Sequence, residues 1–340
     1  MSSFLTIKDI ARLAEVGVST VSRVVNEHPD VNPATRAKVK KVIEDYGYQP
    51  NTNAKHLKQT NSNSVALIIR GANNLFFAPI LEKIQRGIKQ TDYQLIQYYI
   101  DEYADESIEA NRLLNENKVK GFIFLGGSVA EAEKENRLPQ NVPCVFVTVD
   151  GTNTTRENLY SVCSDDRKAA ASAIDVLFDL GHERIAIVGG ILEEYNLIGQ
   201  RKQGVIDSFE AHGKKFDEEL YFSAGFSLLS GYNAMKAGLE KRRDYTAVFA
   251  MSDMMAIGAA RAIHEAGLRI PEDISLIGFD GIDLARYITP TIATIRQPGE
   301  ELAAKSIELL VAGINNEKVA VRHILLPTEY VPGESVKKLV

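Results

Sequence analysis

The chain has 340 residues, of which 45% are hydrophobic and 25% are charged. This composition is typical of a soluble protein with two or three compact domains, and it excludes a largely disordered chain. The formal net charge is −6 at pH 7, which taken alone argues against a nucleic-acid partner.

The lack of long apolar runs, the N-terminal residues and the two cysteines argue against membrane, secreted and disulfide-rich proteins. No apolar run approaches the roughly 18 residues that a membrane span needs. The first residues lack the basic start and apolar stretch of a secretory signal, so we expect a cytoplasmic protein without a membrane partner. Cys144 and Cys163 each lie in an apolar or strand-like context, so we expect no disulfide framework, no metal site and no cofactor.

The charge is unevenly distributed along the chain. Residues 1–60 contain nine Lys and Arg against six Asp and Glu, a balance of +3, so the remainder carries −9. Residues 51–64 are polar and rich in Asn and Ser, which is typical of a linker. This pattern indicates a small unit that favours a polyanion, joined by a linker to an acidic body.

The N-terminal unit is predicted to be all-helical. Helices are expected over 7–13, 18–25 and 34–46, with Thr6 capping the first helix and Asn32-Pro33 starting the third. Gly47 is expected to end the third helix. One small core is expected from Ile10, Ala11, Val21, Val24, Val39 and Ile43.

Two short helices joined by a tight turn and braced by a third form a helix-turn-helix. The second helix would expose Ser19, Thr20, Ser22 and Arg23, which are suited to base edges and phosphates. An ordinary three-helix interaction domain fits the same pattern, so the residues alone leave both readings open.

From residue 65 onward, apolar runs alternate with amphipathic stretches, which predicts an α/β body with parallel sheets. The expected strands are 65–69, 94–99, 121–125, 143–147, 184–188, 247–250 and 274–278. The expected helices are 78–90, 106–117, 165–180, 200–212, 230–240 and 253–266. The series runs twice, which indicates two similar lobes with a cleft lined by loops at the carboxyl ends of the strands.

An enzyme is disfavoured, because there is no Gly-rich dinucleotide or phosphate loop and no nucleophile elbow. His182 precedes a strand, where a structural hydrogen bond is the default, and Asp165-Asp166 open a helix, where capping is the default. A binding cleft fits better, because sugars need charged partners for their hydroxyls and aromatic faces for their C–H surfaces. The candidate cleft residues are Asn74, Phe76, Phe77, Tyr195, Arg201, Phe226, Asp253, Asp280 and Gln297.

Several segments carry a family resemblance that covers essentially the whole chain. The headpiece segments are Thr6-Ile7-Lys8-Asp9-Ile10-Ala11, Val18-Ser19-Thr20-Val21-Ser22-Arg23, Val31-Asn32-Pro33-Ala34-Thr35-Arg36 and Tyr46-Gly47-Tyr48-Gln49-Pro50-Asn51. The body adds Leu180-Gly181-His182-Glu183-Arg184-Ile185-Ala186 and Ile270-Pro271-Glu272-Asp273-Ile274-Ser275-Leu276-Ile277-Gly278-Phe279-Asp280. Together they resemble the LacI/GalR family of bacterial transcriptional regulators.

The resemblance implies how the headpiece would contact DNA. Val18, Ser19 and Arg23 would face bases in the major groove. The residues implied to position the DNA backbone are Thr6, Thr20, Ser22, Asn26, Asn32, Thr35 and Tyr48. The linker would fold on DNA into a hinge helix around Ala54, capped by Asn51, and Leu57 would wedge into the minor groove. Glu15, Gly17 and Lys55 depart from the residues frequent in the family, which are Gly, Ser and Arg.

In the cleft, the resemblance implies that Arg201 and Asp280 face each other and grip the effector, with Phe77 and Phe226 stacking on it. Asp253 matches a further polar position. Leu125 and Thr148 stand where lactose- and purine-type regulators place polar or acidic contacts, so the N-terminal lobe is expected to be more apolar than usual. A sugar or phosphosugar is the expected effector.

The expected organisation is a helix-turn-helix domain at 1–50 and a hinge at 51–63. A body like that of periplasmic binding proteins follows, with an N-terminal lobe of 64–162 plus 293–326 and a C-terminal lobe of 163–292 plus 327–340. The expected function is a homodimeric, effector-controlled repressor that binds a pseudo-palindromic operator. A solute-binding protein for a transporter is the alternative, disfavoured by the headpiece and the lack of an export signal.

Overall fold

The computed structural model describes residues 7–25, 30–46, 63–71, 74–101, 104–133, 137–190 and 196–339. The chain divides into two compact units, residues 1–62 and 63–340. The expected cap at Thr6 and the helix stop at Gly47 lie outside the described residues. Among the described residues, no helix is both long enough and apolar enough to cross a membrane.

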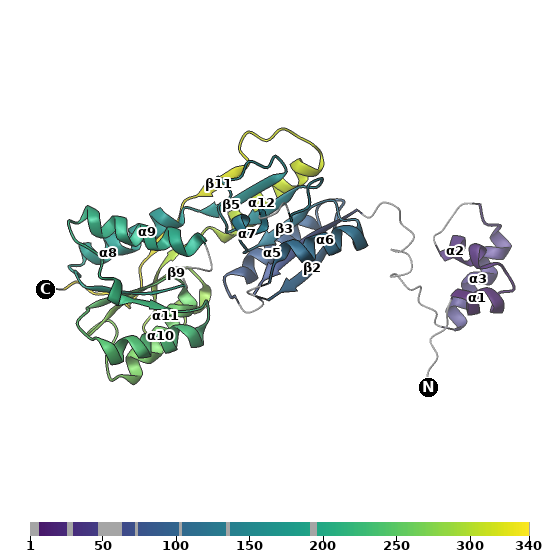
Figure 1. Cartoon of the computed structure of the whole chain (residues 1–340). Helices are drawn as coiled ribbons and strands as arrows, with labels where there is room; N and C mark the ends of the chain where they lie inside the picture. Colours follow the sequence, from purple (N-terminus) through teal and green to yellow (C-terminus); the bar gives the residue numbers. More distant parts are fainter. Residues whose placement is uncertain are drawn as a thin grey trace. The chain divides into compact units, whose positions relative to one another are not determined.

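The first unit contains the three predicted helices, α1 (Ile7–Leu13), α2 (Val18–Val25) and α3 (Pro33–Asp45), shown in purple in Figure 1. Asn32 caps α3, because its Oδ1 accepts the backbone N–H of Ala34 at 2.9 Å, and Pro33 occupies the first position as expected. The predicted core is confirmed, with Ile43 partly buried and with Ala14 and Val31 added.

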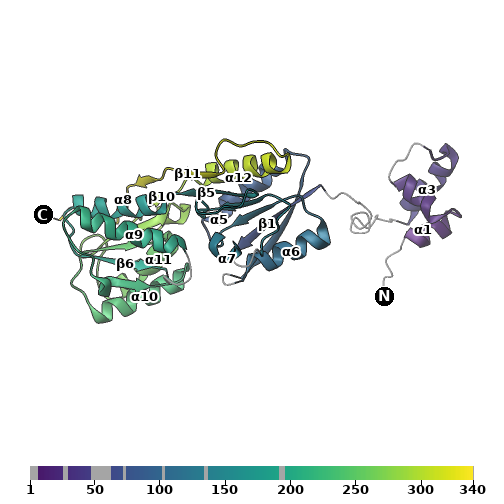
Figure 2. The ribbon, with the colours of Figure 1, turned by 45° about the horizontal axis from the view of Figure 1, so that its top comes forward.

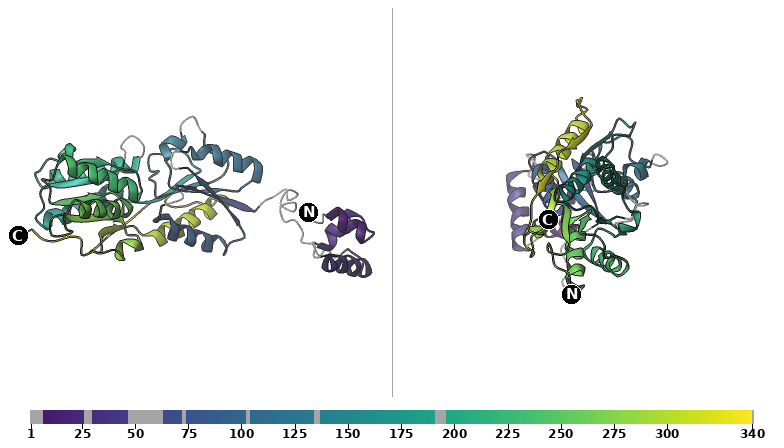
Figure 3. Two further views of the ribbon diagram at one scale, coloured as in Figure 1. Left: turned by 90° about the horizontal axis from the view of Figure 1, so that it is seen from below. Right: turned by 90° about the vertical axis from the view of Figure 1, so that its left-hand side faces the viewer.

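The first lobe of the second unit is built on a six-stranded parallel sheet with the order β11-β5-β4-β3-β1-β2. Its strands are β1 (Ser64–Arg70), β2 (Gln94–Ile100), β3 (Phe122–Leu125), β4 (Cys144–Val147), β5 (Leu159–Ser164) and β11 (His323–Leu326). Helices α5 (Phe77–Ile88) and α12 (Gly299–Ile314) pack against each other on one face of the sheet. Helices α6 (Glu106–Asn117) and α7 (Val129–Glu133) cover the other face, as Figure 3 shows.

The second lobe repeats this plan with the order β12-β10-β9-β8-β6-β7. Its strands are β6 (Ile185–Gly189), β7 (Tyr221–Ser223), β8 (Ala247–Ala250), β9 (Ser275–Asp280), β10 (Ala293–Arg296) and the antiparallel β12 (Glu329–Val331). Helices α8 (Asp166–Asp179) and α9 (Asn196–Ala211) cover one face. Helices α10 (Leu228–Lys241) and α11 (Asp253–Glu265) cover the other, as Figure 2 shows, and short 3₁₀ turns η2 (Glu218–Leu220) and η3 (Asp283–Arg286) complete the lobe.

The predicted strands and helices all occur, with ends that shift by a few residues. Near-continuous apolar strands are buried on both faces, as in Phe122–Leu125, because helices cover both sides of each sheet. The structure adds elements that were not predicted from the sequence: β5, β7, β10, β11, β12, α7 and α12.

The chain passes between the lobes three times, and two of the predicted boundaries are corrected. The first crossing follows β5 and so lies after Ser164, not at residue 162. The second follows β10, which pairs with β9 in the second lobe; residues 293–296 therefore do not belong to the first lobe. The third lies between β11 and β12, at Pro327 and Thr328, close to where it was expected.

Candidate functional site

The exposed face of α2 carries the residues predicted to read bases. Val18, Ser19 and Arg23 are exposed, whereas Val21 and Val24 on the same helix are buried in the headpiece core. An apolar side chain left in solvent beside Ser and Arg is the arrangement that a base edge and a thymine methyl group can use. The helix therefore presents the predicted set together on one surface.

The residues expected to contact phosphates differ in how far their side chains are exposed. Thr20, Ser22 and Thr35 are half-buried, and the Asn32 side-chain oxygen is used to cap α3. The remaining predicted DNA contacts lie outside the described residues: Thr6, Asn26, Tyr48, Asn51, Ala54 and Leu57.

In the turn between α1 and α2, Glu15 has a positive φ of 50°, the left-handed conformation that favours glycine. Gly17 precedes α2, and its carbonyl accepts the N–H of Thr20 at 2.9 Å. Two of the three departures from the family pattern, Glu15 and Gly17, therefore fall on the turn and at the residue before α2; the third, Lys55, lies outside the described residues.

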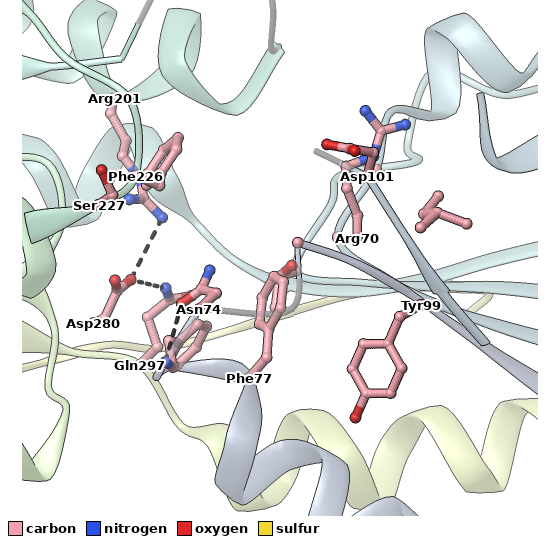
Figure 4. A pocket seen from close by; sticks show the side chains of 16 residues that line it. Arg70, Asn74, Phe77, Tyr99, Asp101, Arg201, Phe226, Ser227, Asp280 and Gln297 are labelled. Atoms are coloured by element: carbon pink, nitrogen blue, oxygen red, sulfur yellow. Dashed lines mark hydrogen bonds and ion pairs between the residues drawn. The ribbon is translucent and has the colours of Figure 1, made fainter. Parts of the chain in front are cut away.

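A cavity of about 510 Å³ lies between the two lobes of the second unit, within the size range of small-molecule sites. It is lined by loops at the carboxyl ends of both sheets, as predicted for a parallel α/β fold. Seven of the predicted cleft residues line it: Asn74, Phe76, Phe77, Arg201, Phe226, Asp280 and Gln297. Figure 4 labels six of them, Asn74, Phe77, Arg201, Phe226, Asp280 and Gln297, which come from both lobes.

Arg201 on α9 is the cation on the second-lobe side of the pocket. Its Nε donates to Asp166 Oδ1 at 2.7 Å, and its Nη1 donates to the carbonyl oxygen of Met251 at 2.5 Å. The guanidinium carbon lies 3.8 Å from the centroid of the Phe279 ring. Arg201 is only 5% exposed, so three neighbours hold its planar group in one orientation at the pocket wall.

Asp280 at the end of β9 is the carboxyl group beside Arg201. Its Oδ1 lies 4.0 Å from Arg201 Nη2 and accepts Gln297 Nε2 at 2.8 Å. Burial raises the pKa of Asp280 to about 8, with the nearby Arg201 guanidinium acting in the opposite direction. Its φ of 111° is strained for a residue with a side chain, a feature that tends to occur at ligand clamps.

Aromatic rings frame this polar group from both lobes. Phe77 begins α5 and Phe226 precedes α10, and both are half-buried where they line the pocket. Asn74 Oδ1 accepts the N–H of Phe76 at 3.0 Å, which fixes the loop that carries Phe76 and Phe77. Rings beside hydrogen-bonding groups can accept the C–H face of a sugar while its hydroxyls are satisfied.

The first-lobe side is more polar than the sequence led us to expect. Arg70, Tyr99, Asp101 and Thr148 line the pocket, and Arg70 forms an ion pair with the buried Glu106. Arg70 lay in a predicted cleft loop without being selected, and Asp101 lies two residues after the predicted strand 94–99. The rule that selected Asp280 at a strand end could therefore have found Asp101 as well.

Comparison with known proteins agrees with both units. Residues 6–51 match the bacterial regulatory proteins of the lacI family, and residues 174–336 match the periplasmic binding protein-like domain. The HTH-type transcriptional regulator MalR of Clostridium butyricum is 36% identical over 97% of this chain and 99% of its own length. The chain belongs to the lacI family of bacterial regulatory proteins.

Solved structures of lacI-family proteins share the fold. The complex of the transcriptional regulator CelR with cellobiose has a TM-score of 0.73 and 28% identity, over 97% of this chain and 99% of the other. The lac repressor dimer bound to operator and the anti-inducer ONPF has a TM-score of 0.77 and 25% identity, over 98% and 100%. The predicted resemblance is confirmed, and this lacI-family protein is a DNA-binding transcriptional regulator and not an enzyme.

In this lacI-family regulator, one predicted cleft residue, Asp253, is not among the described residues that line the pocket. Asp253 is fully buried, and its carboxylate accepts the N–H groups of Gly281 and Ile282, both at 2.8 Å, and the hydroxyl of Thr294 at 2.7 Å. As the first residue of α11 it points into the lobe and anchors the turn after β9, so the expectation for Asp253 is corrected. Tyr195 lies outside the described residues.

Two structural predictions for other polar residues are confirmed. His182 is fully buried; its Nε2 donates to the carbonyl of Lys337 at 3.0 Å, and its Nδ1 accepts Thr246 Oγ1 at 2.9 Å. Asp165 caps α8 by accepting the N–H of Lys168. Cys144 and Cys163 are both buried free thiols. These residues stabilise the body and take no part in the pocket.

Proposed function

We propose that this regulator is a homodimeric repressor that acts in the bacterial cytoplasm, binds a pseudo-palindromic operator and is controlled by a sugar in the interlobe pocket. The observation that carries the proposal is the fixed polar group of Arg201, Asp280 and Gln297, which lines one pocket with the rings of Phe77 and Phe226. One cation and one carboxyl group held side by side suit a pair of neighbouring hydroxyls.

The operator-reading surface in this proposal is the exposed face of α2. Val18, Ser19 and Arg23 would contact base edges, while the half-buried Thr20 and Ser22 would position the backbone. From the family resemblance we add that Leu57 wedges into the minor groove and that the segment around Ala54 forms a hinge helix on DNA.

Dimerisation is supported by large apolar side chains of the second lobe that are left in solvent. Leu229 at the start of α10 is 68% exposed and Tyr287 after η3 is 81% exposed. The start of α10 and the turn before η3 both contact α11, through Gly258 and Asp253 respectively. Exposed apolar surface of this kind marks an interface, and a two-fold operator requires a symmetric dimer.

Control would operate through closure of the two lobes. A ligand that contacts both walls of the pocket stabilises one closure state, and only a state with different affinity for DNA can transmit the signal. The three crossings between the lobes are the segments that would bend. Hydrogen exchange at residues 51–60 on operator DNA should therefore change when the effector is added; identical protection with and without it would refute the coupling.

The proposed function is tested by two measurements on the full chain. A thermal-shift screen of sugars identifies compounds that raise the melting temperature. A sugar present at a hundred times its Kd should add about 2.7 kcal/mol to the free energy of unfolding. The same compounds are then tested for an effect on operator binding in a gel-shift assay. Asp280→Asn serves as the control, because it should lose the stabilisation by the sugar while still binding the operator.

A further inference from the structure

The carboxyl group of Asp253 joins three segments of the second lobe. Asp253 begins α11, and its Oδ2 accepts the N–H groups of Gly281 and Ile282 in the turn after β9, both at 2.8 Å. Its Oδ1 accepts the hydroxyl of Thr294 on β10 at 2.7 Å. One side chain therefore fixes the end of β9 and the strand beside it in a single arrangement.

The turn after β9 and the end of β10 both lead to pocket residues. Asp280 directly precedes Gly281 at the end of β9. Gln297 follows Thr294 by three residues, and its Nε2 donates to Asp280 Oδ1 at 2.8 Å (Figure 4). Asp280 has a φ of 111°, which a residue with a side chain keeps only when its surroundings hold it there. The bonds from Asp253 to the next two N–H groups constrain this backbone.

The packing around Asp253 makes room for its carboxyl group. Asp253 is fully buried, and a Cβ at Gly278 would collide with its Oδ1, so glycine is needed there on β9. Burial raises the pKa of Asp253 to about 7, while the hydrogen bonds from Thr294 and from the backbone act in the opposite direction. Burying a carboxyl group is unfavourable, and these donors offset it only while the turn and β10 stay in place.

Asp253 also acts on Asp280 through its charge. The charged groups that influence Asp280 come from three helices, namely Arg201 on α9, Asp253 on α11 and Asp166 on α8. Burial is the main cause of the raised pKa of Asp280; the guanidinium group lowers this pKa, and the two neighbouring carboxyl groups raise it. Asp253 therefore favours the protonated form of Asp280, which can donate a hydrogen bond as well as accept one.

We propose that Asp253 is a positioning residue for effector binding, which holds Asp280 and Gln297 in place through the turn after β9 and through β10. This inference rests on the proposed function, because it assumes that Asp280 and Gln297 bind an effector. Asp253 acts through its bonds to Gly281, Ile282 and Thr294, and its charge adds an electrostatic contribution at Asp280.

The first measurement needs no effector. The full chain, labelled with ¹³C at its aspartates, is titrated with acid and base, and the Asp280 carboxyl carbon is followed by NMR, with Asp280→Asn assigning its signal. Asp253→Asn keeps the size of the side chain and one acceptor oxygen but removes the charge. We expect the midpoint of the Asp280 titration to fall by about one pH unit in this variant, because a neighbouring negative charge is lost.

The second measurement is isothermal titration of the full chain with cellobiose, maltose, ribose and glucose. For the probes that bind the wild-type protein, Asp253→Asn should weaken binding about tenfold, because the turn after β9 loses a charged acceptor. Thr294→Val removes the bond to β10 and keeps the carboxyl group. It should weaken binding about threefold without lowering the Asp280 midpoint.

Ser335→Ala is the matched control. Ser335 is also fully buried, and its Oγ joins β9 and β10 at their other ends, where it donates to the carbonyl of Leu276 and accepts the N–H of Ala293. This variant should lower the melting temperature but leave both the Asp280 midpoint and the affinity for the probes unchanged.

The outcomes separate this inference from the proposed function. An unchanged Asp280 midpoint or unchanged probe affinity in the Asp253→Asn protein overturns the inference, because Asp253 would then only stabilise the lobe, as Ser335 does. If that protein does not fold, Thr294→Val decides, and unchanged affinity overturns the inference. If no probe binds the wild-type protein, the sugar chemistry of the proposed function fails, whereas the Asp280 midpoint still decides this inference.

Discussion

Asp166, the first residue of α8, orients Arg201: its Oδ1 accepts a hydrogen bond of 2.7 Å from Arg201 Nε. Asp166 lies two residues after the end of β5, at the first crossing between the lobes. The cation at the pocket wall is thus tied to the segment that must bend when the lobes close.

The first prediction concerns this pair. Asp166→Asn should keep a hydrogen bond but remove the charge, and so weaken effector binding by about tenfold, since the neutral side chain orients Arg201 less firmly. Asp166→Ala should also destabilise the protein by about 3 kcal/mol, because Arg201 would be left as a buried unpaired charge. Titration calorimetry and thermal unfolding measure the two effects. Asp207→Asn, which breaks the exposed pair with Arg167, is the control and should change neither.

The second prediction concerns pH. Burial raises the pKa of Asp280 to about 8, above its value of about 3.9 in the unfolded chain. The unfolded state therefore loses this proton first, and the stability contributed by the protonated group is lost as pH rises from about 4 to about 8. Asp280→Asn mimics the protonated form, so without effector its melting temperature should exceed that of the wild-type protein by more at pH 8 than at pH 5. A constant difference at both pH values would contradict the raised pKa.

The third prediction concerns the recognition helix. Gly17→Ser should stabilise α2 by a few tenths of a kcal/mol, because a serine hydroxyl can accept a first-turn N–H and the added Cβ meets only ordinary contacts. Slower hydrogen exchange over residues 18–25 in the full chain would report the gain. Gly17→Ala adds the Cβ without the hydroxyl; equal protection in the alanine and serine proteins would contradict the capping argument.

The fourth prediction concerns assembly. Leu229→Glu should shift the protein from dimer to monomer in sedimentation velocity, because a charge would be buried at the proposed interface. Operator affinity should fall with it, since each monomer reads only half a site. Ile108 on α6 is also strongly exposed, and Ile108→Glu should leave the dimer intact. A monomeric wild-type protein at micromolar concentration would refute the interface.

The fifth prediction concerns base reading. Arg23→Ala should cost about 1–3 kcal/mol of operator affinity and reduce discrimination at one base pair. Arg12→Ala removes another exposed arginine, on α1, that pairs with Asp9, and it should have a much smaller effect. Gel-shift titrations with operator and with scrambled DNA at fixed salt compare the two. If the two variants lost equal operator affinity, Arg23 would contribute only its positive charge.

The sequence was most informative where local chemistry decides the structure. Asn32-Pro33 predicted the start of α3 because cap and first position depend on adjacent residues. It was least informative for the short strands β10, β11 and β12, since each contains a polar residue and lacks the continuous apolar run that marked the equally short β3, β4 and β8. Helix α12 is different: Gly299–Ile314 has a clear amphipathic pattern, and its omission was avoidable.

The pocket residues also differ in whether local sequence was enough to place them. Asp280 could be placed because it lies at a strand end, and Arg201 and Asp280 both match family positions. Asp253 satisfied the same rule and was wrong, because only the packed structure reveals that its carboxylate faces the backbone of Gly281 and Ile282. Arg70 could not be recognised as a fixed pocket cation, since its partner Glu106 is 36 residues away in the chain.

The edge strands β11 and β12 have a consequence for how the protein is made. The sheet of the first lobe is completed only at Leu326 and that of the second only at Val331, whereas the headpiece core uses residues 10–43. Domains generally fold in order as the chain emerges from the ribosome. The nascent regulator therefore acquires its DNA-reading unit early in synthesis, and both walls of its sensing pocket become complete within five residues of each other, nearly three hundred residues later.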